Sequence, residues 1–269
     1  MKRVVTALTA ASLAVAAIVL LESFWVFWIA LALAVGCAVE YVALGKRLYT
    51  DLPRAPLPIA LGAIALAWLG PFGAGAWADP WVLLAVGPLA FAVLLLPRGG
   101  APGRAVGALG WLSFGLPYLV LPVWSLYELH RLSPRLLLVL LVAVWGNDSF
   151  AFWVGSAWGR RKLAPRLSPK KTWEGAYAGL AGGVILALAG VFWIEGRLRW
   201  QLLAALAVAV VAAQIGDLVE SMLKRAASVK DSGRLVPGHG GLLDRLDAII
   251  LAAPVFYGLF GLLGLAAGG

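Results

Sequence analysis

Four carboxylates at the ends of the last two apolar stretches, Asp217, Glu220, Asp244 and Asp247, could form a metal site. We expect Glu220 to orient Lys224 or Arg225 and the three aspartates to bind the ion. Asp217 lies near the end of the stretch 200–223, and Asp244 and Asp247 lie at the entry to the stretch 246–265. Residues three or four apart on a helix share a face, so Asp244 and Asp247 should lie on the same side. Mg²⁺ is bound by oxygen ligands and keeps positions for substrate phosphates. The spacing therefore indicates a hard-cation site that serves phosphate chemistry.

The segment between these aspartates has the features of a phosphate-binding loop. Pro237-Gly238-His239-Gly240-Gly241 is compact and poor in side chains, so its amide groups can approach a phosphate closely. Ser221 falls on the same helical face as Asp217. Positive charge surrounds the loop and is supplied by Lys224, Arg225, Lys230 and Arg245. The alternative is a solvated connecting loop whose internal salt bridges each contribute little.

A third polar group, Asn147-Asp148-Ser149, interrupts the apolar stretch 136–158. A carboxylate at membrane depth costs about 2.5–3.5 kcal/mol on insertion scales. Asp148 should therefore face a wet cavity or a cation. The alternative is a hydrogen-bonded clasp between helices, made by Asn147 and Ser149, with Asp148 merely near the surface.

The loop 159–171 contains six basic residues and no acidic one. Ser168 or Thr172 can cap the following helix, and Pro169 suits a first helical turn. Lys170–Lys171 at a helix N-terminus would make a good anion site, so we predict that phosphate binds here. The alternatives are a loop that only sets the topology, or a weak patch for anionic lipids.

The elements that must position these residues are membrane helices. Hydrophobic residues make up 62% of the chain and charged residues 13%, well outside the usage of soluble domains. Each span needs roughly 20 apolar residues, and about nine such spans fit. We predict an all-α polytopic integral membrane protein. It forms one domain over 1–269, with the catalytic motifs on the helices of 136–269 and further helices in 1–135. The single Cys37 excludes an intrachain disulfide or a cysteine metal cluster.

Lysine and arginine are distributed unevenly between alternate loops. Of the 22 basic residues, 18 fall on one side of the predicted topology and 4 on the other. An excess of basic residues marks the cytoplasmic face, so we predict a cytoplasmic N-terminus and an active site at that face. Nucleic acid is not expected as a partner, because the net charge of +9 is mostly topogenic. The stretch 4–21 could be a signal peptide, but similar spans follow, so we interpret it as the first span.

The stretch 221–247 resembles the signature of the phosphatidate cytidylyltransferases, the CDP-diacylglycerol synthases. The residues that match in register are Ser221, Leu223, Lys224, Arg225, Lys230, Asp231, Gly233, Val236, Pro237, His239, Gly240, Gly241, Leu242, Asp244, Arg245, Leu246 and Asp247. Val236 is the mildest departure, because a larger apolar residue is more usual there. Asp148, followed by Ser168-Pro169-Lys170-Lys171-Thr172 and then Glu174-Gly175, resembles the second motif of the family.

The resemblance implies a reaction in which CTP and phosphatidic acid give CDP-diacylglycerol and pyrophosphate, in phospholipid biosynthesis. It implies Mg²⁺ held by Asp217 and Asp244, with Asp247 and Asp148 as helpers, and a second, monovalent cation. The expected catalytic residues are Asp217, Asp244, Lys224, Arg225, His239 and Arg245. The expected substrate-binding residues are Ser168, Lys170, Lys171, Thr172, Ser221, Lys230, Gly240 and Gly241. His239 would donate to a phosphate oxygen and not act as a base, since the attacking phosphate is already ionised.

The expected partners are CTP, phosphatidic acid and the bilayer, with a homodimer left open and the inner (plasma) membrane as the location. The chief alternative is another membrane CTP-dependent transferase or kinase that acts on a different lipid phosphate or an isoprenoid. It would share the nucleotide site and differ in the lipid pocket. A transporter is disfavoured, because it should show paired broken helices in two repeated halves.

Overall fold

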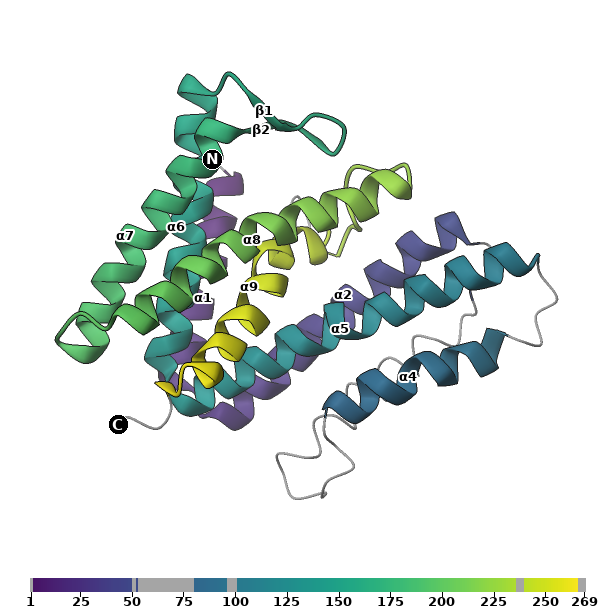
Figure 1. The fold of residues 1–269 in the computed structure, drawn as a ribbon, viewed down its shortest axis with the longest axis horizontal. Coiled ribbons are helices and arrows are strands. Elements are labelled where there is room, and N and C mark those ends of the chain that lie inside the picture. Colours follow the sequence, from purple (N-terminus) through teal and green to yellow (C-terminus); the bar gives the residue numbers. More distant parts are fainter. Residues whose placement is uncertain (1, 50–51, 53–79, 96–100, 236–239, 266–269) are drawn as a thin grey trace. The chain divides into compact units, whose positions relative to one another are not determined.

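The computed structural model describes residues 2–49, 52, 80–95, 101–235 and 240–265 of the chain. These residues are mostly helical (Figure 1). The helices are α1 (Lys2–Leu20), α2 (Ser23–Leu48), α4 (Pro80–Leu95), α5 (Pro102–Leu132), α6 (Pro134–Trp158), α7 (Trp173–Glu195), α8 (Trp200–Ala226) and α9 (Leu243–Leu262). Two short strands, β1 (Lys162–Ala164) and β2 (Ser168–Thr172), separate α6 from α7.

Six of the described helices are long and apolar enough to cross a membrane. They are α2, α5, α6, α7, α8 and α9. The N-terminal helix α1 contains a shorter apolar run, Ala11–Leu20, and α4 has 16 residues. The prediction of a helical, multi-pass membrane protein is confirmed. The span expected at 59–72 lies outside the described residues, so the count of nine stays a prediction.

Contacts divide the chain into two compact units. Unit 1 comprises Met1–Phe27, Ser125–Met222 and Leu246–Gly269. Unit 2 comprises Trp28–Trp124 and Leu223–Arg245. Each unit takes segments from both the N-terminal and the C-terminal half of the sequence. The single integral domain expected over 1–269 stays a prediction.

The core of unit 1 takes most of its buried side chains from α6, α8 and α9, and α7 packs closely along α6 (Figure 1). Three glycines of α7, four residues apart, face backbone oxygens of α6. A Cβ atom on Gly175, Gly179 or Gly183 would lie 2.8, 2.7 or 2.9 Å from the carbonyl oxygen of Ala151, Asn147 or Ala143, respectively. Small residues let membrane helices approach this closely. The glycines thereby fix which residue of α6 lies beside which residue of α7.

The basic loop between α6 and α7 is an antiparallel hairpin. Strand β1 pairs with β2 in a register that sets Lys162 opposite Thr172 and Ala164 opposite Ser168. The Glu174 carboxylate accepts the backbone N–H groups of Arg160 and Arg161, at 3.1 and 3.2 Å, and so closes the base of the hairpin.

The start of α7 agrees with one expectation and overturns another. Thr172 is the N-cap, because its Oγ1 accepts the backbone N–H of Gly175 at 3.2 Å. The cap predicted at this position is therefore confirmed. The placement of Pro169 in a first helical turn is wrong, since Pro169 lies within β2. Its fixed φ suits an extended strand as well as a helix start.

In unit 2, an aromatic contact joins α2 to α5. The rings of Tyr41 and Trp111 stack with centroids 4.7 Å apart, and the Tyr41 hydroxyl donates to the Trp111 carbonyl oxygen at 2.7 Å. Both side chains are buried. This contact fixes the rotation of α2 about its axis and therefore the direction of its neighbour, Glu40.

Candidate functional site

A hydrogen-bonded clasp in unit 1 joins the polar residues of α6 to α8. The Gln214 amide nitrogen donates to Asn147 Oδ1 at 2.6 Å and to the Ala176 carbonyl oxygen of α7 at 2.9 Å. Asn147 is buried and donates in turn to Asp148 Oδ1 at 3.0 Å. Ser149 bonds only within its own helix, to the Trp145 carbonyl oxygen. The interhelical clasp foreseen for Asn147 thus exists, with Gln214 and not Ser149 as its second member.

Next to this clasp, unit 1 gathers two carboxylates and a lysine. Lys171 of β2 forms an ion pair with Asp217 of α8, with 2.5 Å between Nζ and Oδ2. The lysine side chain is 27% exposed and the aspartate side chain 33%. Asp148 is exposed and lies within the electrostatic range of both Asp217 and Lys171. The motifs 147–149, 168–172 and 214–217, remote in sequence, therefore meet at one place.

The two lysines of β2 are placed differently. Lys171 is half-buried against Asp217, whereas Lys170 is exposed. Side chains alternate between the two faces of a strand, so neighbouring lysines cannot both face the carboxylates. Ser168 is half-buried, and the Thr172 hydroxyl is engaged as the helix cap.

Helix α9 comes close to α8 beside Asp217. A Cβ atom on Gly216 would lie 2.5 Å from the Asp247 carbonyl oxygen, so only glycine allows this approach. The Asp247 carboxylate accepts the backbone N–H of Ala248 at 2.8 Å. Ser221, one helical turn after Asp217, is half-buried. Asp247 is thus held at the level of Asp217 within unit 1.

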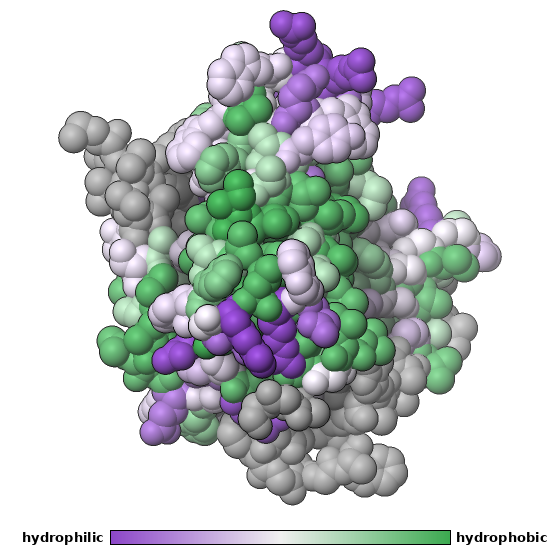
Figure 2. Space-filling view, turned by 60° about the vertical axis from the view of Figure 1, so that its left-hand side comes forward, coloured by the Kyte–Doolittle hydropathy of each residue, from purple (hydrophilic) through white to green (hydrophobic). Residues whose placement is uncertain are grey.

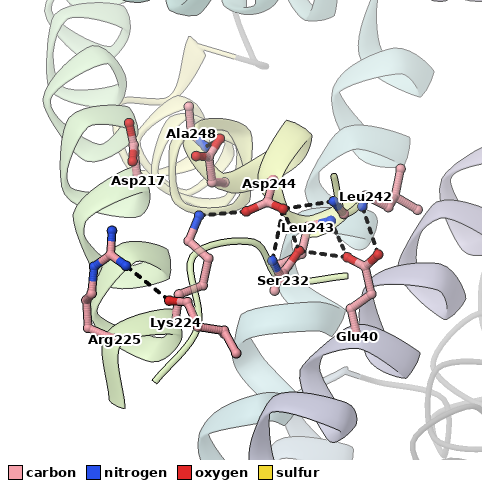
Figure 3. Close-up of polar contacts among 12 residues, drawn as sticks. Glu40, Asp217, Lys224, Arg225, Ser232, Leu242, Leu243, Asp244 and Ala248 are labelled. Atoms are coloured by element: carbon pink, nitrogen blue, oxygen red, sulfur yellow. Dashed lines mark hydrogen bonds and ion pairs between the residues drawn. The ribbon is translucent and has the colours of Figure 1, made fainter. Parts of the chain in front are cut away.

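In unit 2, Asp244 bonds to both sides of the loop that connects α8 to α9, here called the motif loop (Figure 3). Its Oδ1 accepts from Lys224 Nζ at 2.6 Å. Its Oδ2 accepts from the Ser232 backbone N–H at 2.9 Å, the Ser232 hydroxyl at 3.0 Å and the Gly241 N–H at 2.8 Å. The Lys224 and Asp244 side chains are only 13% and 9% exposed. Asp244 therefore joins the end of α8, the loop and the start of α9.

Glu40 of α2 supports the same loop and was missed in the sequence. Its carboxylate accepts the N–H groups of Leu242 and Leu243, at 3.0 and 2.9 Å, and lies 2.9 Å from the Ser232 hydroxyl, whose single hydrogen is shared between Glu40 and Asp244 (Figure 3). A helix N-terminus has unpaired N–H groups and a positive dipole end, so a buried carboxylate is favourable there. The available signal was a lone carboxylate in the apolar stretch 24–44, which is costly without a partner.

The remaining predicted residues of this loop have separate environments. Arg225 donates to the Val229 carbonyl oxygen at 3.1 Å. Lys230 and Arg245 are exposed. Gly240 has a φ of 87°, a conformation that favours glycine. A Cβ atom on Gly241 would overlap the Ser232 hydroxyl and lie 2.5 Å from Glu40 Oε2. His239 lies outside the described residues.

The donor set fits a magnesium ion that a substrate helps to bind. Among the described residues, no group of three or more His, Cys, Asp or Glu side chains could enclose a metal. Mg²⁺ commonly takes one or two carboxylates and completes its shell with water and phosphate oxygens. Asp217, one third exposed, and the neighbouring Asp148 are oxygen donors of this kind.

Similar proteins were found over most of the chain. Phosphatidate cytidylyltransferase of Brucella abortus is 35% identical over 246 residues, which are 89% of this chain and 88% of that protein. The enzyme of the same name from Pseudomonas aeruginosa is 43% identical over 155 residues, 55% of this chain and 57% of that protein. That from Bacillus subtilis is 44% identical over 126 residues, 45% of each chain. The model of the Cytidylyltransferase family matches residues 1–263. The chain therefore belongs to the Cytidylyltransferase family.

Proposed function

We propose that this protein transfers the CMP moiety of CTP to phosphatidic acid and releases pyrophosphate, giving CDP-diacylglycerol. The name shared by relatives that align over nearly nine-tenths of the chain carries the choice of substrates. The structure contributes membrane-length helices that bring Asp148, Asp217 and Lys171 together. An enzyme that joins a soluble nucleotide to a lipid needs both features.

The reaction makes one phosphorus–oxygen bond and breaks another. A phosphate oxygen of the lipid attacks the α-phosphorus of CTP, and the bond from that phosphorus to the bridging oxygen of pyrophosphate breaks. The nucleophile is already ionised, so no general base is required. Because two polyanions meet, catalysis depends mainly on positioning and on neutralising charge. The residues proposed to supply positive charge are Lys170, Lys171, Lys224, Arg225, Lys230 and Arg245, and His239 is proposed to donate to a phosphate oxygen.

The carboxylates are proposed to hold magnesium together with the CTP phosphates. Bound there, the ion would neutralise phosphate charge and fix the orientation of the triphosphate. Asp217 and Asp244 are the principal ligands of the proposal, with Asp148 and Asp247 as helpers and a second, monovalent cation nearby. Lys171 and Lys224 each contact one of the principal aspartates. Each lysine would therefore compete with a metal ion for its carboxylate and would be free to turn to a phosphate once the ion binds.

The site is proposed to face the cytoplasm from the inner membrane. The support is the distribution of basic residues, of which 18 fall on the side of the motif loops and 4 on the other. CTP is a cytoplasmic nucleotide, so the catalytic loops must be reached from there. Nine spans and a cytoplasmic N-terminus complete the proposal, and the question of a homodimer is left open.

The test is a transfer assay with purified protein, labelled CTP, Mg²⁺ and phosphatidic acid. Wild type should form a labelled CDP-lipid and pyrophosphate. Asp217→Ala should insert and purify normally but lose Mg²⁺-dependent transfer. The matched control is Glu195→Gln, which removes an ion pair with Arg199 of similar exposure, 22% and 23%, at the other end of α7.

Three outcomes separate the parts of the proposal. Near-normal transfer by Asp217→Ala would remove this residue from the metal site. The wild-type protein could instead make no CDP-diacylglycerol and modify another lipid phosphate or an isoprenoid. That result would support the proposed nucleotide site and show that the lipid substrate is a different one. Loss of transfer in Glu195→Gln as well would show that the assay reports general damage.

A further inference from the structure

The hairpin β1–β2 lies where membrane-spanning helices leave the bilayer. It connects the end of α6 directly to the start of α7, and both helices are of membrane length. Trp158 ends α6 and Trp173 begins α7, with side chains 71% and 44% exposed. Tryptophan favours the headgroup level of a bilayer. The hairpin is therefore held at that level from both of its ends.

The outer surface of the hairpin is strongly basic. Arg160, Arg161, Lys162 and Arg166 are all exposed, and the segment 159–171 contains no acidic residue. Among the described residues, none of these four forms an ion pair with a carboxylate. Figure 2 shows hydrophilic side chains at the top of the view, where Figure 1 places the hairpin.

Exposed aromatic side chains adjoin this charge. On the last turns of α6, Phe152 and Trp153 are 70% and 60% exposed, and Tyr177 in the second turn of α7 is 64% exposed. In a soluble protein such an apolar surface would need a partner, whereas a bilayer satisfies it. Aromatic rings beside basic side chains match the acyl boundary and the charged headgroups of an anionic leaflet.

The same hairpin reaches the candidate site. Lys162 lies on β1, and Arg166 lies in the turn between the strands. Lys171, on β2, is paired with Asp217. In the hairpin register Lys162 lies opposite Thr172, so its side chain shares the face of Thr172, whereas Lys171 points to the other face, toward Asp217. The hairpin combines a lipid-facing surface with a residue of the site in one small element.

We propose that the hairpin binds the anionic headgroups of the bilayer and thereby concentrates phosphatidic acid in the leaflet next to the candidate site. The named surface consists of Arg160, Arg161, Lys162 and Arg166, flanked by the aromatic residues above. The identity of the lipid rests on the proposed function, whereas the preference for anionic headgroups does not.

The binding test uses the protein in phosphatidylcholine vesicles that contain a trace of spin-labelled phosphatidic acid, without CTP or Mg²⁺. Electron paramagnetic resonance measures the immobilised fraction of this lipid against spin-labelled phosphatidylcholine. Each basic residue at an anionic surface contributes about fivefold in affinity. The double variant Lys162→Gln/Arg166→Gln should therefore lower the preference for phosphatidic acid by up to about 25-fold, and by about fivefold if only one of the two residues contacts the headgroup.

The matched control removes two exposed charges from the opposite ends of α6 and α7. Arg135→Gln/Arg197→Gln changes the net charge equally and lies away from the hairpin. Its effect on the preference should be clearly smaller. An equal loss in both double variants, or no loss in the hairpin variant, would overturn the proposal.

A kinetic arm distinguishes a lipid headgroup from a nucleotide phosphate. In vesicles with increasing phosphatidic acid, the hairpin variant should need a several-fold higher lipid fraction for half-maximal velocity. Its kcat and its KM for CTP should remain those of wild type. A raised KM for CTP with an unchanged lipid requirement would assign the hairpin to the nucleotide and refute the proposal. If wild type fails to make CDP-diacylglycerol but the hairpin variant loses lipid preference, the proposed function fails and this inference stands.

Discussion

Two lysine–aspartate pairs, one in each unit, have nearly the same length and very different surroundings. Lys171 and Asp217 lie 2.5 Å apart, and Lys224 and Asp244 lie 2.6 Å apart. In the first pair about a third of each side chain is exposed. In the second pair the exposed fractions are 13% and 9%, and Asp244 accepts three further hydrogen bonds from the loop.

The difference separates an accessible carboxylate from a buried one that also orders the loop. A half-exposed pair contributes little to stability, since water already solvates both ions. Separating Asp217 from its lysine should therefore cost little, as the proposed binding of a metal ion would require. A buried carboxylate that orders several backbone groups is expensive to disturb. Asp244 fixes the shape of the loop, and any metal it binds would approach through Oδ1, the oxygen that contacts Lys224.

The largest expected effect is the loss of stability in Asp244→Ala. Removing one partner of a buried, hydrogen-bonded pair costs about 3–5 kcal/mol. The matched variant Asp217→Ala should change the unfolding free energy by less than about 1 kcal/mol. Thermal unfolding of both proteins in the same detergent measures the difference. Equal stability of the two variants would contradict the division between an accessible aspartate and a buried, loop-ordering one.

A smaller loss is expected for Glu40→Ala. The variant leaves the N–H groups of Leu242 and Leu243 without their acceptor, at a cost of about 2 kcal/mol in unfolding free energy. Glu40→Gln keeps one acceptor oxygen and should recover part of the loss. The KM for CTP should rise in Glu40→Ala, because the loop loses its shape.

Glu22→Ala, at an exposed position just before α2, is the control for this experiment and should behave as wild type. Full stability and an unchanged KM for CTP in Glu40→Ala would show that the loop does not depend on the hydrogen bonds that Glu40 accepts.

The smallest effect should follow from Gln214→Leu in unit 1. Its amide joins Asn147 to α7, and the loss of these bonds should cost about 1 kcal/mol. The loss of transfer activity should be larger than this small loss of unfolding free energy would by itself cause, because Asn147 orients Asp148. Gln201→Leu, at an exposed position on the same helix, controls for the change of side chain. Activity equal to wild type in Gln214→Leu would show that the clasp does not contribute to transfer.

Features with a local cause could be predicted from the sequence. The long helices follow from apolar runs, and the Thr172 cap follows from a hydroxyl placed just before such a run. The hairpin could not be predicted in the same way. Its strands have three and five residues and no apolar alternation, so a basic loop and a hairpin look alike.

Contacts between remote residues also escaped prediction. Glu40 is separated from Ser232 and Leu243 by 192 and 203 positions, and nothing near it in the sequence indicates those partners. The grouping of Lys171 with Asp217 depends on how β2 lies against α8, which the motifs themselves do not indicate. The sequence thus indicates which residues carry chemistry, whereas packing decides which of them meet.

The row of glycines on α7 has a mechanical consequence. Gly175, Gly179 and Gly183 repeat every four residues, which is about 6 Å along a helix. A slide of α7 along α6 by less than this distance would push other side chains against the backbone oxygens that the glycines now accommodate. Positions between two such steps are therefore disfavoured by steric overlap. The glycine row thus holds the hairpin and Lys171 in register with the end of α6.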